Sequence, residues 1–331
     1  MATRYIALKT PTPGGLLAWL LLFGCTFALA WSSASLGEEA HANGFDVGGA
    51  LVPQDEILEG GPPRDGIPAL TTPRFVAAAD ATFLRADDSV LGVSLRGVTK
   101  AYPVRILNWH EIINDEIAGE PVAVSFCPLC GTGAAFYAQV RGRRLTFGVS
   151  GLLYNSNLLL YDKETLSLWS QLMNKAISGS LKGTQLESLP VTQTTWKSWR
   201  QAHPDTLVLS DRTGYRRDYA SNPYADYMTS AMLMFRVSKE SHRFQPKEWV
   251  LGVAANGEYK AYPFSELARA GAVVHDHVGG QLLEIRFDPV ARSAQAFSAG
   301  KPYPGQMAYW FAWFAFHPNT EVFQVSRPAA K

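Results

Sequence analysis

The chain contains little cysteine. Its 331 residues include only three, Cys25, Cys127 and Cys130. Folds that depend on disulfides are usually small and use many cysteines, and a chain of this length can bury a full core without them. A disulfide-stapled fold is therefore excluded. A structural zinc site of four cysteines is excluded as well, because such sites normally combine two CxxC pairs.

An excess of charge of one sign is also absent. The chain has 30 Lys and Arg residues against 29 Asp and Glu residues, a net charge of +1. No strong field would therefore attract nucleic acid or an anionic membrane. The sequence has no Walker loop, dinucleotide-binding glycine fingerprint, nucleophile elbow or HExxH motif. We expect no nucleic-acid partner and no nucleotide cofactor.

The apolar run at the N-terminus is short for a membrane span, which needs about 20 residues. It follows a basic start with Arg4 and Lys9 and ends in Ala28-Leu29-Ala30, a small-x-small pattern that signal peptidase accepts. We interpret residues 1–34 as a signal peptide, with an uncleaved N-terminal anchor as the alternative. The predicted location is periplasmic or otherwise extracytoplasmic. The protein would contact the inner membrane only if this segment stays attached.

Export would change the number of cysteines in the mature chain and therefore the roles that they can have. If Cys25 leaves with the signal peptide, the mature chain keeps only Cys127 and Cys130. A bridge between them would close a very short loop and would constrain the unfolded chain little. We expect this pair to have a local, chemical role.

The chain repeats itself. After a lead-in at 35–73, which is rich in glycine, proline and acids and is expected to be extended, "VLGVSLRGVTKAYPVRIL" (90–107) recurs as "VLGVAANGEYKAYPFSEL" (250–267). A second block, "WKSWRQAHPDTLV" (196–208), recurs as "WFAWFAFHPNTEV" (310–322). Two blocks in the same order predict an internal duplication.

The repeated unit predicts the fold class. Alternating apolar residues around glycine turns indicate strands, and prolines indicate the starts of short helices. We expect a β-rich α+β fold in which two tandem copies of a mainly antiparallel β unit form one domain, 74–327, with a pseudo-twofold axis. Copy one would span 90–209 with an insertion at 137–195, and copy two would span 250–323.

The two copies differ at a few residues with metal or redox chemistry. "FCPLCG" at 126–131 becomes "FDPVAR" at 287–292, and "WHE" at 109–111 becomes "RAG" at 269–271. Residues that match in both copies are needed for the fold, whereas residues special to one copy are candidates for chemistry. This comparison selects His110, Cys127 and Cys130.

The selected residues are suited to a soft metal ion. In Cys-Pro-Leu-Cys-Gly, the turn directs backbone N–H groups at the sulfurs, as in a metal knuckle, and His110 would be the third ligand. Two thiolates and an imidazole with one open position suit copper or zinc, and the exported location favours copper.

Two alternatives to the metal site stay open. The CxxC pair could act as a thiol–disulfide oxidoreductase, although the residues that follow it predict a strand instead of the usual helix. The protein could also be a non-enzymatic binding or structural module with a local disulfide. Whether it is an enzyme is not decided, and its partner would be an unidentified small molecule or exported protein.

Polar and aromatic residues near the pair could support the site through hydrogen bonds. The candidates are Trp109, Tyr154, Asn155, Ser156, Asp162, Trp169 and Gln171. Asn157 belongs to the same polar stretch as Tyr154 to Ser156, and these residues could instead be polar groups satisfied within a turn.

Several motifs resemble one protein family. They are "SFCPLCGTGAAF" (125–136), "GLLYNSNLLLYD" (151–162), "SLWSQ" (167–171), "HPDTLVLS" (203–210) and "WFAWFAFHPNTEVF" (310–323). With these motifs the chain resembles the exported bacterial and archaeal proteins grouped as "domain of unknown function 3179", over about residues 70–325. The resemblance implies one exported domain with a shared site at the cysteines, and it implies no particular reaction.

Overall fold

The computed structural model describes residues 40–325. The predicted signal peptide or anchor at 1–34 and Cys25 lie outside the described residues. Within 40–325, no helix is long and apolar enough to cross a membrane.

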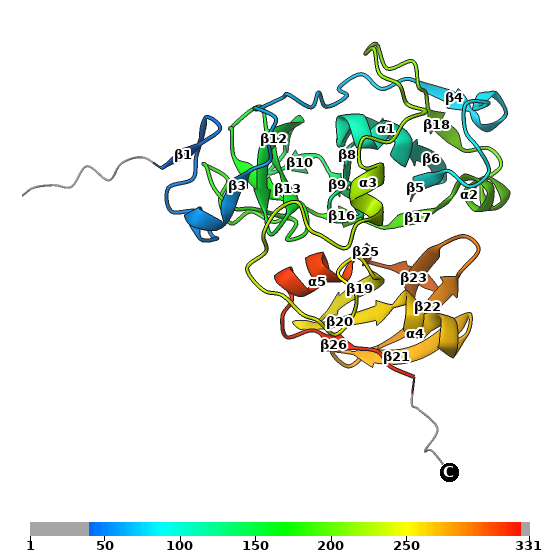
Figure 1. The fold of residues 1–331 in the computed structure, drawn as a ribbon. Coiled ribbons are helices and arrows are strands. Elements are labelled where there is room, and N and C mark those ends of the chain that lie inside the picture. The colour runs from blue at the N-terminus through cyan, green and yellow to red at the C-terminus, as the bar shows by residue number, and fades with distance from the viewer. Residues whose placement is uncertain (1–39, 326–331) are drawn as a thin grey trace, which may run out of the picture. The chain divides into compact units, whose positions relative to one another are not determined.

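Five sheets of four or five strands form a five-bladed β-propeller, and the helices are short (Figure 1). The predicted fold class of two tandem copies with a pseudo-twofold axis is therefore wrong, although the β-rich character is confirmed. The segment predicted as an insertion supplies most of a whole sheet, and this fifth blade has no counterpart in residues 250–323.

The first two blades are joined by α1 (Val104–His110). One has the strand order β17-β5-β6-β18-β4, with β18 parallel to β6, and the other has the order β16-β9-β8-β7. Their strands are β4 (Phe75–Ala77), β5 (Ser89–Leu95), β6 (Val98–Pro103), β7 (Ile112–Ile117), β8 (Glu120–Cys127), β9 (Thr132–Tyr137), β16 (Ser188–Leu189), β17 (Val191–Thr195) and β18 (Leu207–Leu209).

Two further blades are joined by α4 (Phe264–Ala270) and have strand orders β25-β19-β20-β26 and β21-β22-β23-β24. Here β26 is parallel to β20. Their strands are β19 (Trp249–Ala255), β20 (Glu258–Pro263), β21 (Val273–Val278), β22 (Gln281–Asp288), β23 (Ser293–Ser298), β24 (Lys301–Tyr303), β25 (Gly305–Tyr309) and β26 (Glu321–Val322).

A tryptophan packs on a strand glycine in both pairs of blades. A Cβ atom at Gly92 would lie 2.2 Å from Trp199, and one at Gly252 would lie 2.2 Å from Trp313. Only glycine leaves room for this close approach. The recurring Gly and Trp-x-x-Trp residues are therefore explained by packing.

The fifth blade has the order β15-β14-β13-β12-β3. Its strands are β3 (Ile57–Glu59), β12 (Phe147–Tyr154), β13 (Asn157–Asp162), β14 (Leu168–Ser170) and β15 (Lys175–Ala176). Because β3 pairs with β12, the lead-in contributes an edge strand to the fold. The other elements are β1 (His41–Ala42), β2 (Phe45–Asp46), η1 (Gln54–Glu56), η2 (Ala78–Asp80), β10 (Gln139–Val140), β11 (Arg143–Arg144), α2 (Trp196–Ala202), α3 (Ala225–Thr229) and α5 (Trp310–Phe316).

Candidate functional site

The two cysteines lie in the tight turn between β8 and β9. The Cys130 N–H bonds to the Cys127 carbonyl at 3.3 Å, and Gly131 follows with a φ of 68°. A side chain at Gly131 would come within 2.6 Å of Trp249. Both thiols are free, with exposures of 1% for Cys127 and 0% for Cys130. The turn therefore holds two neighbouring thiols inside the protein.

The environment makes the two thiols unequal. Burial alone would raise the pKa of Cys127, but hydrogen bonds from the Cys130 thiol and from the backbone at Leu158, Cys130 and Leu129 outweigh burial, so this pKa is lowered. Burial and the adjacent Cys127 raise the pKa of Cys130 well above its usual value. Cys127 is therefore the sulfur that ionises first, and Cys130 is its hydrogen-bond donor.

The corresponding turn between β22 and β23 holds a carboxylate. There, the N–H groups of Val290 and Ala291 both donate to Asp288 Oδ1 at 2.9 Å. Asp288 ends β22 as Cys127 ends β8, and each pairs with the first residue of the next strand. Backbone N–H groups that converge in this way favour an anion. The Cys127 sulfur lies where the same kind of turn binds a carboxylate.

Ser156 brings a backbone carbonyl to the thiols. Asn155 and Ser156 connect β12 to β13 as a two-residue turn in which both φ angles are positive, 49° and 61°, as type I′ hairpins require. The Ser156 carbonyl then lies 3.1 Å from Cys130 Sγ and 3.8 Å from Cys127 Sγ. The Cys130 S–H thus has two acceptors within reach, and a Cys127 thiolate is the stronger one.

A buried polar network supports Cys130. The Asn157 amide donates to Cys130 Sγ at 3.6 Å and to Gln171 Oε1 at 2.8 Å. Gln171 also accepts from the Thr132 hydroxyl at 2.7 Å and donates to Ser125 Oγ at 3.0 Å. Such a network fixes the position of its members because an unpaired buried polar group is costly.

Glu111 ends α1 in an uncommon backbone conformation for a residue other than glycine, with φ 57° and ψ −33°. Its side chain is 8% exposed, and within residues 40–325 no group hydrogen-bonds to the carboxyl. Burial raises the pKa of Glu111 to about 8, and the charge of Cys127 adds to this shift. The residue after α4 is Gly271, with φ 107°. The chain keeps an acid beside the thiols at a position where the backbone favours glycine.

His110 points to other partners. Its Nδ1 lies 2.7 Å from the Pro68 carbonyl, and its Nε2 lies 2.7 Å from the Tyr219 hydroxyl. Within the described part of the chain, no group of three or more His, Cys, Asp and Glu side chains is arranged to hold a metal ion. His110 would have to leave both partners to join Cys127 and Cys130, so the residues as placed do not fit the predicted metal site, which stays a prediction.

Residues 211–247, here called the cover segment, lie over the dithiol. The Tyr227 hydroxyl donates to the Leu129 carbonyl, inside the cysteine turn, at 2.9 Å. Burial raises the pKa of the Tyr224 phenol, and the charges of Glu111 and Cys127 add to this shift. Tyr224 also packs against the core cluster that contains both cysteines.

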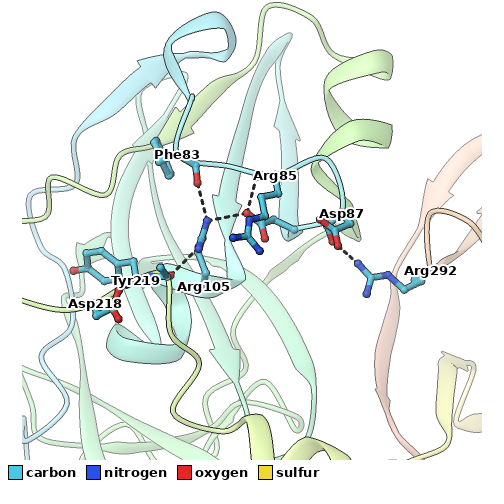
Figure 2. Close-up of polar contacts among 9 residues, drawn as sticks. Phe83, Arg85, Asp87, Arg105, Asp218, Tyr219 and Arg292 are labelled. Atoms are coloured by element: carbon cyan, nitrogen blue, oxygen red, sulfur yellow. Dashed lines mark hydrogen bonds and ion pairs between the residues drawn. The ribbon is translucent and has the colours of Figure 1, made fainter.

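Helix α1 anchors one end of the cover segment. Arg105 donates to the Tyr219 carbonyl at 2.8 Å, to the Phe83 carbonyl at 2.7 Å and to Asp88 at 3.0 Å. Figure 2 shows Arg105 directed at Phe83 and Tyr219. His110 binds the hydroxyl of the same Tyr219. Within the segment, Lys247 donates to the carbonyls of Tyr227, Ser230 and Met232 and so holds the segment's own turns together. The Ser238 N–H attaches this part of the segment to the fifth blade by donating to Asn155 Oδ1 at 2.7 Å.

Only some of the residues that were predicted to support the cysteine site through hydrogen bonds lie at that site. Of the seven supporting candidates, Ser156 and Gln171 reach the cysteine network. Trp109 Nε1 donates to the Ser221 carbonyl in the cover segment at 3.4 Å, and Asn155 accepts from the Ser238 N–H at 2.7 Å. Asp162 accepts from Trp169 Nε1 at 2.9 Å within its own hairpin. Tyr154 packs edge-on against Phe316.

Three residues of the site were not selected from the sequence: Glu111, Ser125 and Thr132. Ser125 and Thr132 gave no separate signal, whereas Asn157 belongs to the polar stretch that the sequence indicated and does reach Cys130. The signal for Glu111 was present in the change from "WHE" to "RAG", because a glycine at 271 indicates a positive φ at that position.

The fold and the site define a β-propeller with a buried pair of free, unequal cysteines. The chain belongs to the family described as "Protein of unknown function (DUF3179)", whose model matches residues 64–302. The resemblance seen in the sequence is thereby confirmed. No curated protein and no solved structure matches the chain.

Proposed function

We propose that this is an exported thiol–disulfide redox protein in which Cys127 and Cys130 alternate between a dithiol and a disulfide. The observation that carries the proposal is the placement of Cys127 Sγ where the corresponding turn binds the Asp288 carboxylate. A thiolate held in this way, with a second thiol hydrogen-bonded to it, is the arrangement that exchange chemistry needs.

The reaction balances with a partner protein that carries a disulfide. The Cys127 thiolate attacks one sulfur of that disulfide, and the other sulfur leaves as a thiolate. Cys130 then loses its proton and attacks Cys127 Sγ, which releases the second partner thiolate. The Cys127–Cys130 disulfide forms, two electrons pass to the partner, and the partner ends as a dithiol. The reverse sequence would oxidise the partner.

The proton that leaves Cys130 needs an acceptor near the two buried sulfurs. The titratable groups that face Glu111 are Cys127, Cys130 and, from the cover segment, Tyr224. Burial raises the pKa of Glu111 to about 8, so its carboxylate form can act as the base of the site near neutral pH. Within residues 40–325 no hydrogen bond joins its carboxyl to either sulfur, so the proton would cross through an intervening water.

Access to a partner requires movement of the cover segment. With both sulfurs buried, no partner disulfide can reach Cys127 in line with the bond to be broken. The contact to release is that of Tyr227 with Leu129, and the bonds of Lys247 within the segment support Tyr227 in this position. Opening of this segment would then control the rate of exchange.

The test is a redox titration of the full-length protein purified from periplasm. After equilibration in glutathione buffers of graded potential, denaturation in acid and labelling with a maleimide, we expect zero labels on Cys127 and Cys130 at oxidising potentials and two at reducing ones. The variants Cys127→Ser and Cys130→Ser should each keep one label and lose the transition.

Metal analysis of the same preparation separates the competing hypotheses. Two thiols that stay reduced at every potential would overturn the redox function. Stoichiometric copper or zinc that is lost in both cysteine variants would favour the metal site predicted from the sequence. A bridge that stays oxidised down to strongly reducing potentials would indicate a structural tie.

A further inference from the structure

The propeller contains a cavity of about 640 Å³ that is separate from the cysteines. It opens between β9, β19 and β25, and its wall is completed by residues 172–175 and by the end of α5. Neither Cys127 nor Cys130 lines it. This volume lies in the range of sites that bind small molecules, roughly 300–1,000 Å³.

The lining carries one positive charge and no negative charge among the described residues. Lys175 is the only Lys, Arg, Asp or Glu that lines the cavity. In the described part of the chain its ammonium group has no hydrogen-bond or ion-pair partner. Glu56 lies nearby: burial raises the pKa of Tyr154, and the charge of Glu56 adds to this shift. Glu56 does not line the cavity itself. A partly buried cation without a partner favours an anionic ligand.

The rest of the wall is neutral and rich in rings. Tyr259 stacks on His317 with ring centroids 4.0 Å apart, and Phe316 contacts Tyr154 edge-on. Burial lowers the pKa of His317 to about 4, so this imidazole is uncharged near neutral pH. Neutral polar groups also line the cavity, among them the amides of Asn174, Gln185, Gln306 and Asn319. Aromatic walls with neutral polar groups suit a ring-containing ligand.

We propose that this cavity binds a small monoanion with an apolar or aromatic body, such as a carboxylate or sulfonate attached to one or two rings, and that Lys175 pairs with the anionic group. A ligand with two or more negative charges would leave charge unpaired, because the lining offers a single cation. This site is independent of the proposed redox function.

The probes for the test are 8-anilinonaphthalene-1-sulfonate and its uncharged analogue N-phenyl-1-naphthylamine, titrated into the full-length protein while their fluorescence is recorded. We expect saturable binding of one equivalent of the sulfonate, tighter than that of the neutral analogue. Lys175→Met should weaken sulfonate binding by about tenfold or more and leave the neutral analogue unchanged. Lys197→Met, on the exposed face of α2, is the matched control and should change neither.

A second variant tests the place of binding. Ala254 lines the cavity and is exposed, so the indole of Ala254→Trp should occupy the cavity without disturbing the fold. Near-ultraviolet circular dichroism checks that the fold is unchanged. Binding of both probes should be lost. Sulfonate affinity that is equal in the wild type and Lys175→Met, or binding that survives Ala254→Trp, would overturn the proposal, and so would a wild-type protein that binds neither probe.

Discussion

Glu111 and Gly271 occupy corresponding positions at the C-terminal ends of α1 and α4. Each backbone N–H bonds to the helix, Glu111 to the Leu107 carbonyl at 2.7 Å and Gly271 to the Leu267 carbonyl at 3.0 Å. Both residues have a positive φ, 57° for Glu111 and 107° for Gly271. A conformation that glycine adopts freely costs a glutamate on the order of 1–3 kcal/mol. The chain therefore holds this acid against its local backbone preference.

Replacing the strained acid by glycine should stabilise the protein and impair its chemistry. Glu111→Gly removes backbone strain and a buried carboxyl without a hydrogen bond, and we expect a gain of about 1 kcal/mol in the free energy of unfolding. Disulfide formation should slow by about tenfold or more because the base is lost. Thermal denaturation and stopped-flow exchange with a disulfide reagent measure the two effects.

The reverse substitution is the matched control. Gly271→Glu places the same side chain at an exposed end of α4 and should lower stability by about 1 kcal/mol without changing the exchange rate. A Glu111→Gly variant that is less stable than the wild type would refute the strain argument.

The pKa of Glu111 also predicts a pH dependence of stability. This pKa is raised to about 8 in the folded protein from 4.5 in the unfolded chain, first by burial and then by Cys127. The unfolded state therefore loses its proton first, and the free energy of unfolding should fall as pH rises from about 4.5 to about 8, by on the order of 5 kcal/mol at most. Chemical denaturation at several pH values in this range gives the free energy of unfolding as a function of pH. Its decrease with pH should be smaller in Glu111→Gln than in the wild type. An unchanged slope would mean that other groups cause it.

The sequence predicted the strands and short helices well but not the number of blades. Alternating residues and glycine turns are local patterns, and they reveal β5, β6 and their counterparts β19 and β20. Closure of five sheets depends on contacts far apart in the chain, such as the bond from the Tyr309 N–H to the Cys130 carbonyl at 2.8 Å. No local pattern contains that information. The repeat suggested two halves because the blade built on β12 to β15 occurs once.

The sequence pointed to the two cysteines as candidates, but not to Glu111, the acid that we propose as their base. His110 was selected because residues 250–323 lack it, and the structure provides another reason for its presence, the bond to Tyr219. That contact joins residues 109 positions apart, so it could not be predicted from spacing. Glu111 was adjacent in the same motif, and the glycine opposite it was the informative signal.

Release of the cover segment should expose the thiols. Lys247 donates to three carbonyls of the segment and lies 3.5 Å from the ring centroid of Tyr227. Lys247→Met removes these bonds, and we expect the folded protein to react with iodoacetamide about tenfold faster or more. Lys239→Met, exposed on the same segment, should react at the wild-type rate. Equal rates in all three proteins would show that the thiols are reached by another route.

The two cysteines should differ in reactivity once the segment is loosened. In the Lys247→Met background, Cys130→Ser leaves Cys127 as the remaining thiol, and Cys127→Ser leaves Cys130. Burial would raise the pKa of Cys127, but the surrounding hydrogen bonds lower it, whereas burial raises the pKa of Cys130. Because the thiolate is the nucleophile, we expect the protein with Cys127 alone to be alkylated faster at pH 7, by about tenfold or more. Its rate should level off at a lower pH than that of the protein with Cys130 alone. Serine at 130 still donates to Cys127 Sγ, so most of the lowering should persist. Faster alkylation of Cys130 would reverse the assignment of the attacking sulfur, and with it the order of the two exchange steps.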